Sequence, residues 1–179
     1  TKQLEGYGLK VVHNDEVHDY PSYQGSYSRS LNTLKTNLVQ NKDLKIVFDI
    51  HRDGIDKVDE LDKASYNAIR SSSVVNIDGE NVATFSIVLG GGNENIKELK
   101  QFAYHIKAVS DQLYPGLAGK IIIKQSNAFK YKLNQYKSDY SALLEIGNNT
   151  NTIDEALATT KYLSNIIAHS VKTFVVVSE

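Results

Sequence analysis

The chain has 179 residues, of which 41% are hydrophobic and 23% are charged. These values are typical of one globular domain that can bury a full core. Twenty lysines and arginines stand against 21 acidic residues, so the formal charge of -1 gives no electrostatic case for a nucleic-acid partner. The sequence has no cysteine, which excludes disulfides, thiolate nucleophiles and cysteine zinc ligands.

The sequence contains no methionine, which indicates a trimmed or processed chain and not a complete translation product. It also has no signal peptide and no apolar run of the ~18 residues that a membrane span needs. Any membrane anchor is therefore expected in a segment that precedes Thr1. Only two prolines occur and no linker or repeat interrupts the sequence, so residues 1–179 are predicted to form a single domain.

The first quarter of the chain predicts a helix end, a strand and a second helix. Residues 4–8 are typical of the last turn of a helix closed by glycine, and residues 9–12 of a short strand. Leucines recur at helical spacing through residues 28–40. Residues 44–48 form an apolar run that predicts a buried strand.

The middle of the chain predicts a hairpin followed by a long helix. Residues 74–77 and 82–89 flank Asp78-Gly79, a dipeptide that favours a tight turn. Three glycines at 90–92 precede a helix, but the lysine and hydroxyl residues of a phosphate-binding loop are missing, so we expect a turn there. Apolar residues recur at three- and four-residue steps through 96–113.

The last third predicts two more strands and a closing helix. The strands are the apolar runs at 120–124 and 142–146. Thr152-Ile153-Asp154-Glu155 is a capping box that begins the final helix. Strands separated by helices of this length need right-handed crossovers. The sequence therefore predicts an α/β fold with a twisted, mostly parallel sheet, helices on both faces, and strand ends gathered along one edge.

The candidate site lies where the predicted strand at 44–48 meets a polar segment. In open α/β sheets the residues just past the strand ends line the ligand crevice. His51 is placed there, and Asp49 shares its face because side chains alternate along a strand. A carboxylate so placed can orient an imidazole that binds a metal. Glu145, almost at the end of the apolar run 142–146, is expected on the same edge. A carboxylate in an apolar strand is costly unless it is paired, coordinated or used as an acid.

Several short segments, taken together in their order along the chain, resemble those of a known protein family. It resembles stage II sporulation protein P, a branch of the zinc-dependent N-acetylmuramoyl-L-alanine amidases. The resemblance is specific in combination only, and no single segment would carry it. The matching segments are residues 18–23, 25–30, 49–53, 114–117, 134–135, 143–147 and 151–152.

The resemblance implies a zinc amidase-like fold with a zinc ion at the strand ends. By this resemblance His51 is a zinc ligand and Glu145 is the catalytic carboxylate. The family's other two ligands, a histidine and a glutamate, belong to a first strand and the turn after it. We therefore expect the chain to lack that strand and the start of the first helix. Because a catalytic zinc site needs three protein ligands, it is expected to bind zinc poorly and to be inactive alone.

The implied activity is hydrolysis of peptidoglycan at the amide between N-acetylmuramic acid and L-alanine, and also at peptide cross-links. The implied setting is spore engulfment, outside the cytoplasm, on the mother-cell membrane that faces the forespore. The implied partners are stage II sporulation protein D and stage II sporulation protein M. A non-catalytic module that binds cell wall or protein is the main alternative, and a nucleotide-binding domain that uses the glycine triplet is a third.

For several other residues the sequence allows two roles. Arg52 either stabilises a developing oxyanion or a substrate carboxylate, or forms a structural pair with Asp53. His18 either orients its loop or lies near the metal, and the structural reading is favoured. The tyrosine-rich segment around it either contacts substrate or packs within the protein, and packing is favoured. The substrate-binding candidates are His18, Tyr23, Tyr27, Arg29 and Asn151.

Overall fold

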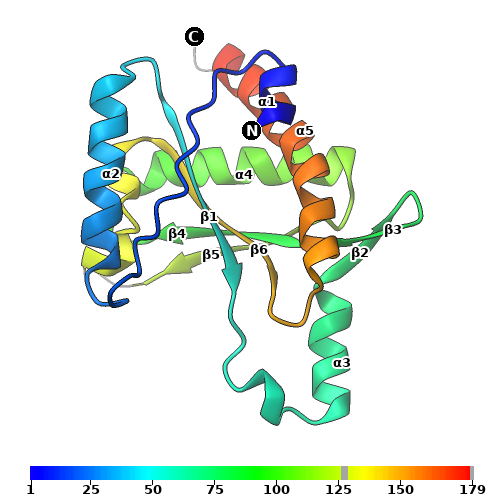
Figure 1. Ribbon diagram of the computed structural model, residues 1–179. Coiled ribbons are helices and arrows are strands. Elements are labelled where there is room, and N and C mark those ends of the chain that lie inside the picture. The colour runs from blue at the N-terminus through cyan, green and yellow to red at the C-terminus, as the bar shows by residue number, and fades with distance from the viewer. Residues whose placement is uncertain (126–128, 178–179) are drawn as a thin grey trace.

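The computed structural model describes residues 1–125 and 129–177, and its elements are labelled in Figure 1. The helices are α1 (Lys2–Gly6), α2 (Ser26–Gln40), α3 (Lys63–Ser72), α4 (Ile96–Leu113) and α5 (Ile153–Val177), with short 3₁₀ helices η1 (Val58–Glu60), η2 (Phe129–Lys132) and η3 (Gln135–Lys137). The strands are β1 (Ile46–Asp53), β2 (Val74–Ile77), β3 (Glu80–Ala83), β4 (Phe85–Gly90), β5 (Ala118–Lys124) and β6 (Tyr140–Asn148).

The main sheet has four strands in the order β1-β6-β4-β5. The pairs β1·β6 and β4·β5 are parallel, whereas β4 and β6 are antiparallel. The α/β class and the mostly parallel character are thus confirmed, but the sheet is mixed. The expectation that all strand ends gather along one edge is wrong, because β4 and β5 end at the edge opposite to the ends of β1 and β6.

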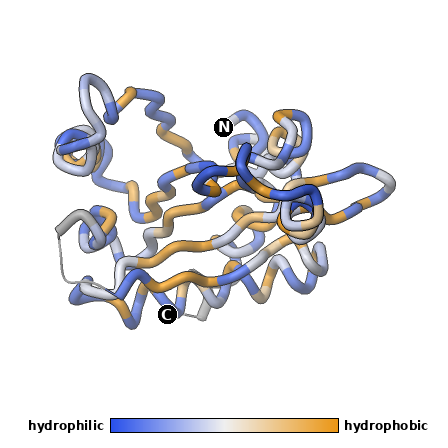
Figure 2. The backbone as a smooth tube through the Cα atoms, turned by 90° about the horizontal axis from the view of Figure 1, so that it is seen from below, coloured by the Kyte–Doolittle hydropathy of each residue, from blue (hydrophilic) through white to orange (hydrophobic). Residues whose placement is uncertain are grey.

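One face of the sheet carries the main hydrophobic core, and Figure 1 shows α4 and α5 on that side. We call it the core face. Figure 2 shows apolar residues concentrated along the strands at the centre of the fold. The opposite face holds a smaller cluster to which α2 contributes Tyr27. The smaller cluster consists of Val88, Leu133 and Leu143, with Tyr27 and Ile122 packed against it.

The predicted strand at 44–48 is longer than its apolar run. β1 continues through Asp53 because β6 pairs with it along its length, as far as the pair Asp53–Asn148. His51 therefore lies within a strand and not in a loop beyond it. The exposed second half of β1 reflects its place at the sheet edge, where polar side chains are tolerated.

The hairpin is confirmed, but its second strand is interrupted. Asp78 and Gly79 both have positive φ, as this turn requires. β3 pairs with β2 in a separate two-stranded sheet, and β4 then enters the main sheet. Between them the Thr84 amide donates to the Ser73 carbonyl at 2.9 Å, which ends the first ladder.

Two further differences concern short elements. Residues 9–12 belong to no helix or strand, so the strand predicted there is wrong. α3, which the sequence analysis did not predict, begins with Asp62 accepting hydrogen bonds from the amides of Ala64 and Ser65. Of the helices described, none has the length and hydrophobicity to cross a membrane.

The glycine triplet makes a turn against η2. A side chain at Gly90 would overlap the Tyr131 carbonyl and the Asn93 side chain. The Gly90 amide is already used, since it donates to the Gln135 side chain at 2.9 Å. This close packing explains the glycine without a bound phosphate.

The core depends on Phe102 of α4, which is 1% exposed and contacts the rings of Phe48, Tyr140 and Phe174. We predict that Phe102→Ala lowers the free energy of unfolding by ~3–5 kcal/mol, because it removes buried area and leaves a cavity. Tyr104→Ala on the same helix, at a side chain 59% exposed, should change it by less than ~0.5 kcal/mol. Urea unfolding of both variants measures this, and equal losses would contradict the assigned core.

Candidate functional site

His51 and Asp49 form a contact on the face of β1 that is turned away from the core face. The His51 Nε2 atom lies 3.1 Å from the Asp49 Oδ1 atom, and both side chains are a little over 40% exposed. The hydrogen bond that the His51 ring donates to Asp49 raises the pKa of His51, an effect that burial opposes and the charges of Asp49 and Glu145 reinforce. The predicted pairing of an orienting carboxylate with His51 is therefore present.

Glu145 lies directly beside His51. The two residues are register partners in the β1·β6 ladder, and on the other side Glu145 pairs with Ser86 of β4. Partners in register share a face, so His51 and Glu145 project to the same side. We call this side the site face; it also carries the smaller hydrophobic cluster.

The carboxylate of Glu145 is only partly satisfied. Its Oε2 atom is buried and has no hydrogen-bond partner among the described residues. Burial raises the pKa of Glu145; the charges of Asp53 and Asp49 add to this, while His51 and Lys124 oppose it. A carboxyl group with a raised pKa beside an imidazole is suited to accepting and returning a proton near neutral pH.

Arg52 holds the loop that follows β6. Its Nε atom donates to the Asn148 carbonyl at 2.9 Å, and its Nη2 atom donates to the Asn151 carbonyl. Among the described ion pairs none joins Arg52 to Asp53, so the structural pair offered as an alternative is wrong. A role for Arg52 toward an oxyanion stays a prediction.

The loop after β6 is bound on several sides. The Asn149 side chain exchanges two hydrogen bonds with the backbone of Ile55, both at 3.0 Å. Asn151 is 6% exposed, and its side chain bonds the Asn148 amide, the Ser73 carbonyl and Glu155. The structure thus gives Asn151 a buried, supporting position, and its contact with substrate stays a prediction.

His18 and Arg29 connect the segment before α2 to the helix. His18 Nε2 lies 2.9 Å from the Thr33 hydroxyl, which agrees with the structural reading of this histidine. Arg29 donates to the carbonyls of His18, Ser22 and Gln24. Both side chains shape the loop, and a direct role toward substrate stays a prediction for each.

The two tyrosines differ in their surroundings. Tyr23 is 74% exposed. Tyr27 packs its ring on the smaller hydrophobic cluster of the site face. Burial, with Tyr23 and the carboxylates of Asp49 and Glu145 nearby, raises the pKa of Tyr27 to about 12. Tyr27 is therefore the substrate-binding candidate that the structure brings close to Glu145.

The donor chemistry of the site suits zinc only in part. Histidine nitrogen and carboxylate oxygen are common zinc ligands, and His51 has no partner on Nδ1 among the residues described. However, the described residues contain no group of three or more histidines or carboxylates arranged to hold a metal ion. Residues 1–125 and 129–177 thus hold a histidine in contact with a carboxylate, without a third donor grouped with them.

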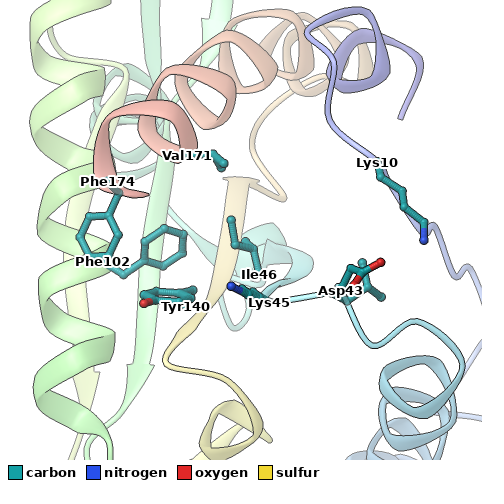
Figure 3. Close-up of a pocket in the computed structure, with 9 residues that line it drawn as sticks. Lys10, Asp43, Lys45, Ile46, Phe102, Tyr140, Val171 and Phe174 are labelled. Carbon is teal, nitrogen blue, oxygen red and sulfur yellow. The ribbon is translucent and has the colours of Figure 1, made fainter. Parts of the chain in front are cut away.

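A pocket of about 250 Å³ lies at the opposite end of β1 and β6 (Figure 3). It opens at the strand starts, whereas His51 and Glu145 lie toward the strand ends. None of the predicted site residues is among those described as lining it. The pocket is lined by Lys10, Asp43, Leu44, Lys45, Ile46, Phe102, Tyr140, Val171 and Phe174.

Two groups near Glu145 were missed by the sequence analysis. Asp53 and Lys124 both act on the charge of Glu145. Alternation from Asp49 through His51 could have indicated Asp53. No sequence signal indicates Lys124, which belongs to β5 and is separated from β6 by one strand, β4.

Comparison with known proteins identifies the family of this chain. The family model described as Stage II sporulation protein P (SpoIIP) matches residues 1–168. The chain belongs to the stage II sporulation protein P family. Stage II sporulation protein P of Bacillus subtilis (strain 168) is 29% identical over 134 residues, which are 75% of this chain and 30% of that protein. No solved structure matches the chain.

The match to the stage II sporulation protein P family includes every candidate site residue, from His18 to Asn151. The chain spans about a third of the length of its Bacillus relative. Membership places the chain among sporulation proteins.

The first site prediction for this stage II sporulation protein P domain concerns Asp49. We expect Asp49→Asn to lower the pKa of His51, because the hydrogen-bonded charge that raises it is removed. Proton NMR titration of the His51 ring measures the shift, with Asp59→Asn as a control at an exposed carboxylate. Unchanged titration in Asp49→Asn would contradict the contact.

The same pair has a consequence for stability. A raised pKa means that the folded chain binds the proton more tightly than the unfolded chain. This stabilisation is fully present below the unfolded value of ~6.5 and is lost as the pH rises through the folded pKa. The difference in stability between wild type and Asp49→Asn should shrink over that interval.

Proposed function

We propose that this domain is the catalytic part of a peptidoglycan hydrolase. Its substrate is the amide between N-acetylmuramic acid and L-alanine, and we extend the proposal to peptide cross-links. Membership of the stage II sporulation protein P family supports a role in sporulation. The observation that carries the proposal is Glu145, half-buried beside His51 with a carboxylate oxygen that has no partner in the described structure.

The chemistry assigned to Glu145 is general acid–base catalysis. Its carboxylate accepts a proton from the water that attacks the amide carbon. The same oxygen then gives that proton to the departing amine nitrogen, so that the C–N bond breaks without forming an amide anion. Such a group contributes ~100- to 10,000-fold to a rate.

His51 is proposed as a zinc ligand, with Asp49 fixing the orientation of its ring. Zinc, when bound, lowers the pKa of its water and polarises the carbonyl. Because the described residues do not complete a zinc site, we propose that the remaining ligands precede Thr1 in the full-length protein. Arg52, which secures the β6 loop, and the residues around α2 complete the proposed groove.

The setting of the protein is part of the same proposal, and membership of a sporulation family supports it. We propose that the protein acts outside the cytoplasm, on the mother-cell membrane facing the forespore, during engulfment. Its proposed partners are peptidoglycan and the stage II sporulation proteins D and M. Membrane attachment is assigned to a segment outside residues 1–179. The formal charge of -1 supports no role for nucleic acid.

A non-catalytic module that binds cell wall or protein is the second candidate. The incomplete metal-ligand set in the described residues favours it. The two functions differ in what Glu145 must do, since binding alone needs no proton transfer.

We predict that Glu145→Gln in the full-length protein lowers peptidoglycan hydrolysis by ~100- to 10,000-fold. Wall binding should be retained, because it needs no proton transfer. The free energy of unfolding at neutral pH should not fall, because the pKa of Glu145 is raised and a neutral amide removes a partly buried charge. Release of wall peptides and co-sedimentation with purified walls measure the two effects. Glu94→Gln is the control at an exposed carboxylate. Full hydrolysis by Glu145→Gln would remove Glu145 as the general base, and wall binding without hydrolysis by the wild type would favour the binding module.

We predict near-stoichiometric zinc in the full-length protein and its loss in His51→Ala. The control is His169→Ala, since His169 bonds the Asn165 carbonyl in its own helix. Metal analysis of the purified proteins gives the ratio of zinc to chain. Equal zinc in wild type and His51→Ala, or none in either, would remove His51 as a ligand.

A further inference from the structure

Tyr27 has an anchored ring and an unused hydroxyl. The ring packs on the smaller cluster of the site face, which includes Leu143, two residues before Glu145 on the same face of β6. The hydroxyl makes no hydrogen bond with any residue that the structure describes. It is also absent from the buried polar atoms without partners, so solvent or a substrate can reach it.

The backbone that carries Tyr27 is held in place. The Asn134 side chain donates to the Tyr27 carbonyl and to the Ser30 hydroxyl, both at 2.9 Å. Arg29 fixes the loop before α2 through three carbonyls. A side chain on such a support needs little reordering when a ligand arrives.

Several side chains around Glu145 are acceptors or are already bonded elsewhere. Its neighbours Asp49 and Asp53 are acceptors, and Arg52 directs Nε and Nη2 to loop carbonyls. The carbonyl oxygen of an amide needs donors, the more so as it gains negative charge. Tyr27 adds a neutral donor from α2 to those of His51 and Lys124, and its raised pKa keeps the hydroxyl protonated at neutral pH.

We propose that the Tyr27 hydroxyl is a catalytic hydrogen-bond donor to the carbonyl oxygen of an amide substrate bound against Glu145. This inference rests on the proposed function. The hydroxyl stabilises the oxyanion that forms when water adds to the carbonyl carbon, and no bond to Tyr27 forms or breaks.

The test is Tyr27→Phe in the full-length protein, with a soluble muropeptide as substrate. The expected result is a ~100- to 1,000-fold lower kcat with little change in KM, as for the loss of one oxyanion donor. The ring and its packing remain, so the urea midpoint should not move. Tyr104→Phe, on the far side of the sheet and 59% exposed, should keep the wild-type kcat.

Glu145→Gln in the same assay separates this inference from the proposed function. If Glu145→Gln is inactive and Tyr27→Phe keeps the wild-type kcat, the donor role is overturned and the hydrolase stands. If Tyr27→Phe raises only KM, or loses kcat together with a lower urea midpoint, the donor role is also overturned. If Glu145→Gln remains active, the substrate is not bound against a catalytic Glu145 and the inference is overturned. If the wild type does not hydrolyse the muropeptide, the hydrolase fails, and the inference fails with it.

Discussion

The parallel register between β1 and β6 is the constraint on which the site depends. It sets His51 beside Glu145 although the residues are far apart in sequence. A shift of one residue would turn His51 to the opposite face, because side chains alternate. The core face prevents this shift, since Phe48 pairs with buried Ala142 and both belong to the main core. Packing on one face therefore fixes the polar geometry on the other.

The ends of these two strands are locked by hydrogen bonds and not by apolar packing. Arg52 and Asn149 connect the segments that follow β1 and β6. Gly147 has φ +60, and a side chain there would overlap the Asn151 carboxamide. Bonds of this kind suit a strand end that must stay open to water on one side while holding its position.

The features that could be predicted from sequence are those with local causes. The capping box of α5 is present, with Thr152 and Glu155 bonding each other's amides as the motif requires. The length of β1 and the antiparallel β4 depend instead on distant strand partners. The proximity of Asp49 to His51 follows from alternation, and that of Glu145 from strand ends. The hydrogen bonds of Arg52 to the loop after β6 could not be predicted, since their acceptors lie 96 and 99 residues away in sequence.

Two carboxylates in the last third of the chain show what a functional group looks like in this fold. Glu155 is 6% exposed, and Arg70, Asn151 and the Thr152 amide bond it, so its pKa is lowered despite burial. Glu145 has a buried oxygen without such partners, and its pKa is raised. Leaving a carboxylate unsatisfied costs stability. The same chain satisfies one carboxylate fully, so the unbonded oxygen of Glu145 beside His51 is the feature on which the proposed hydrolase depends.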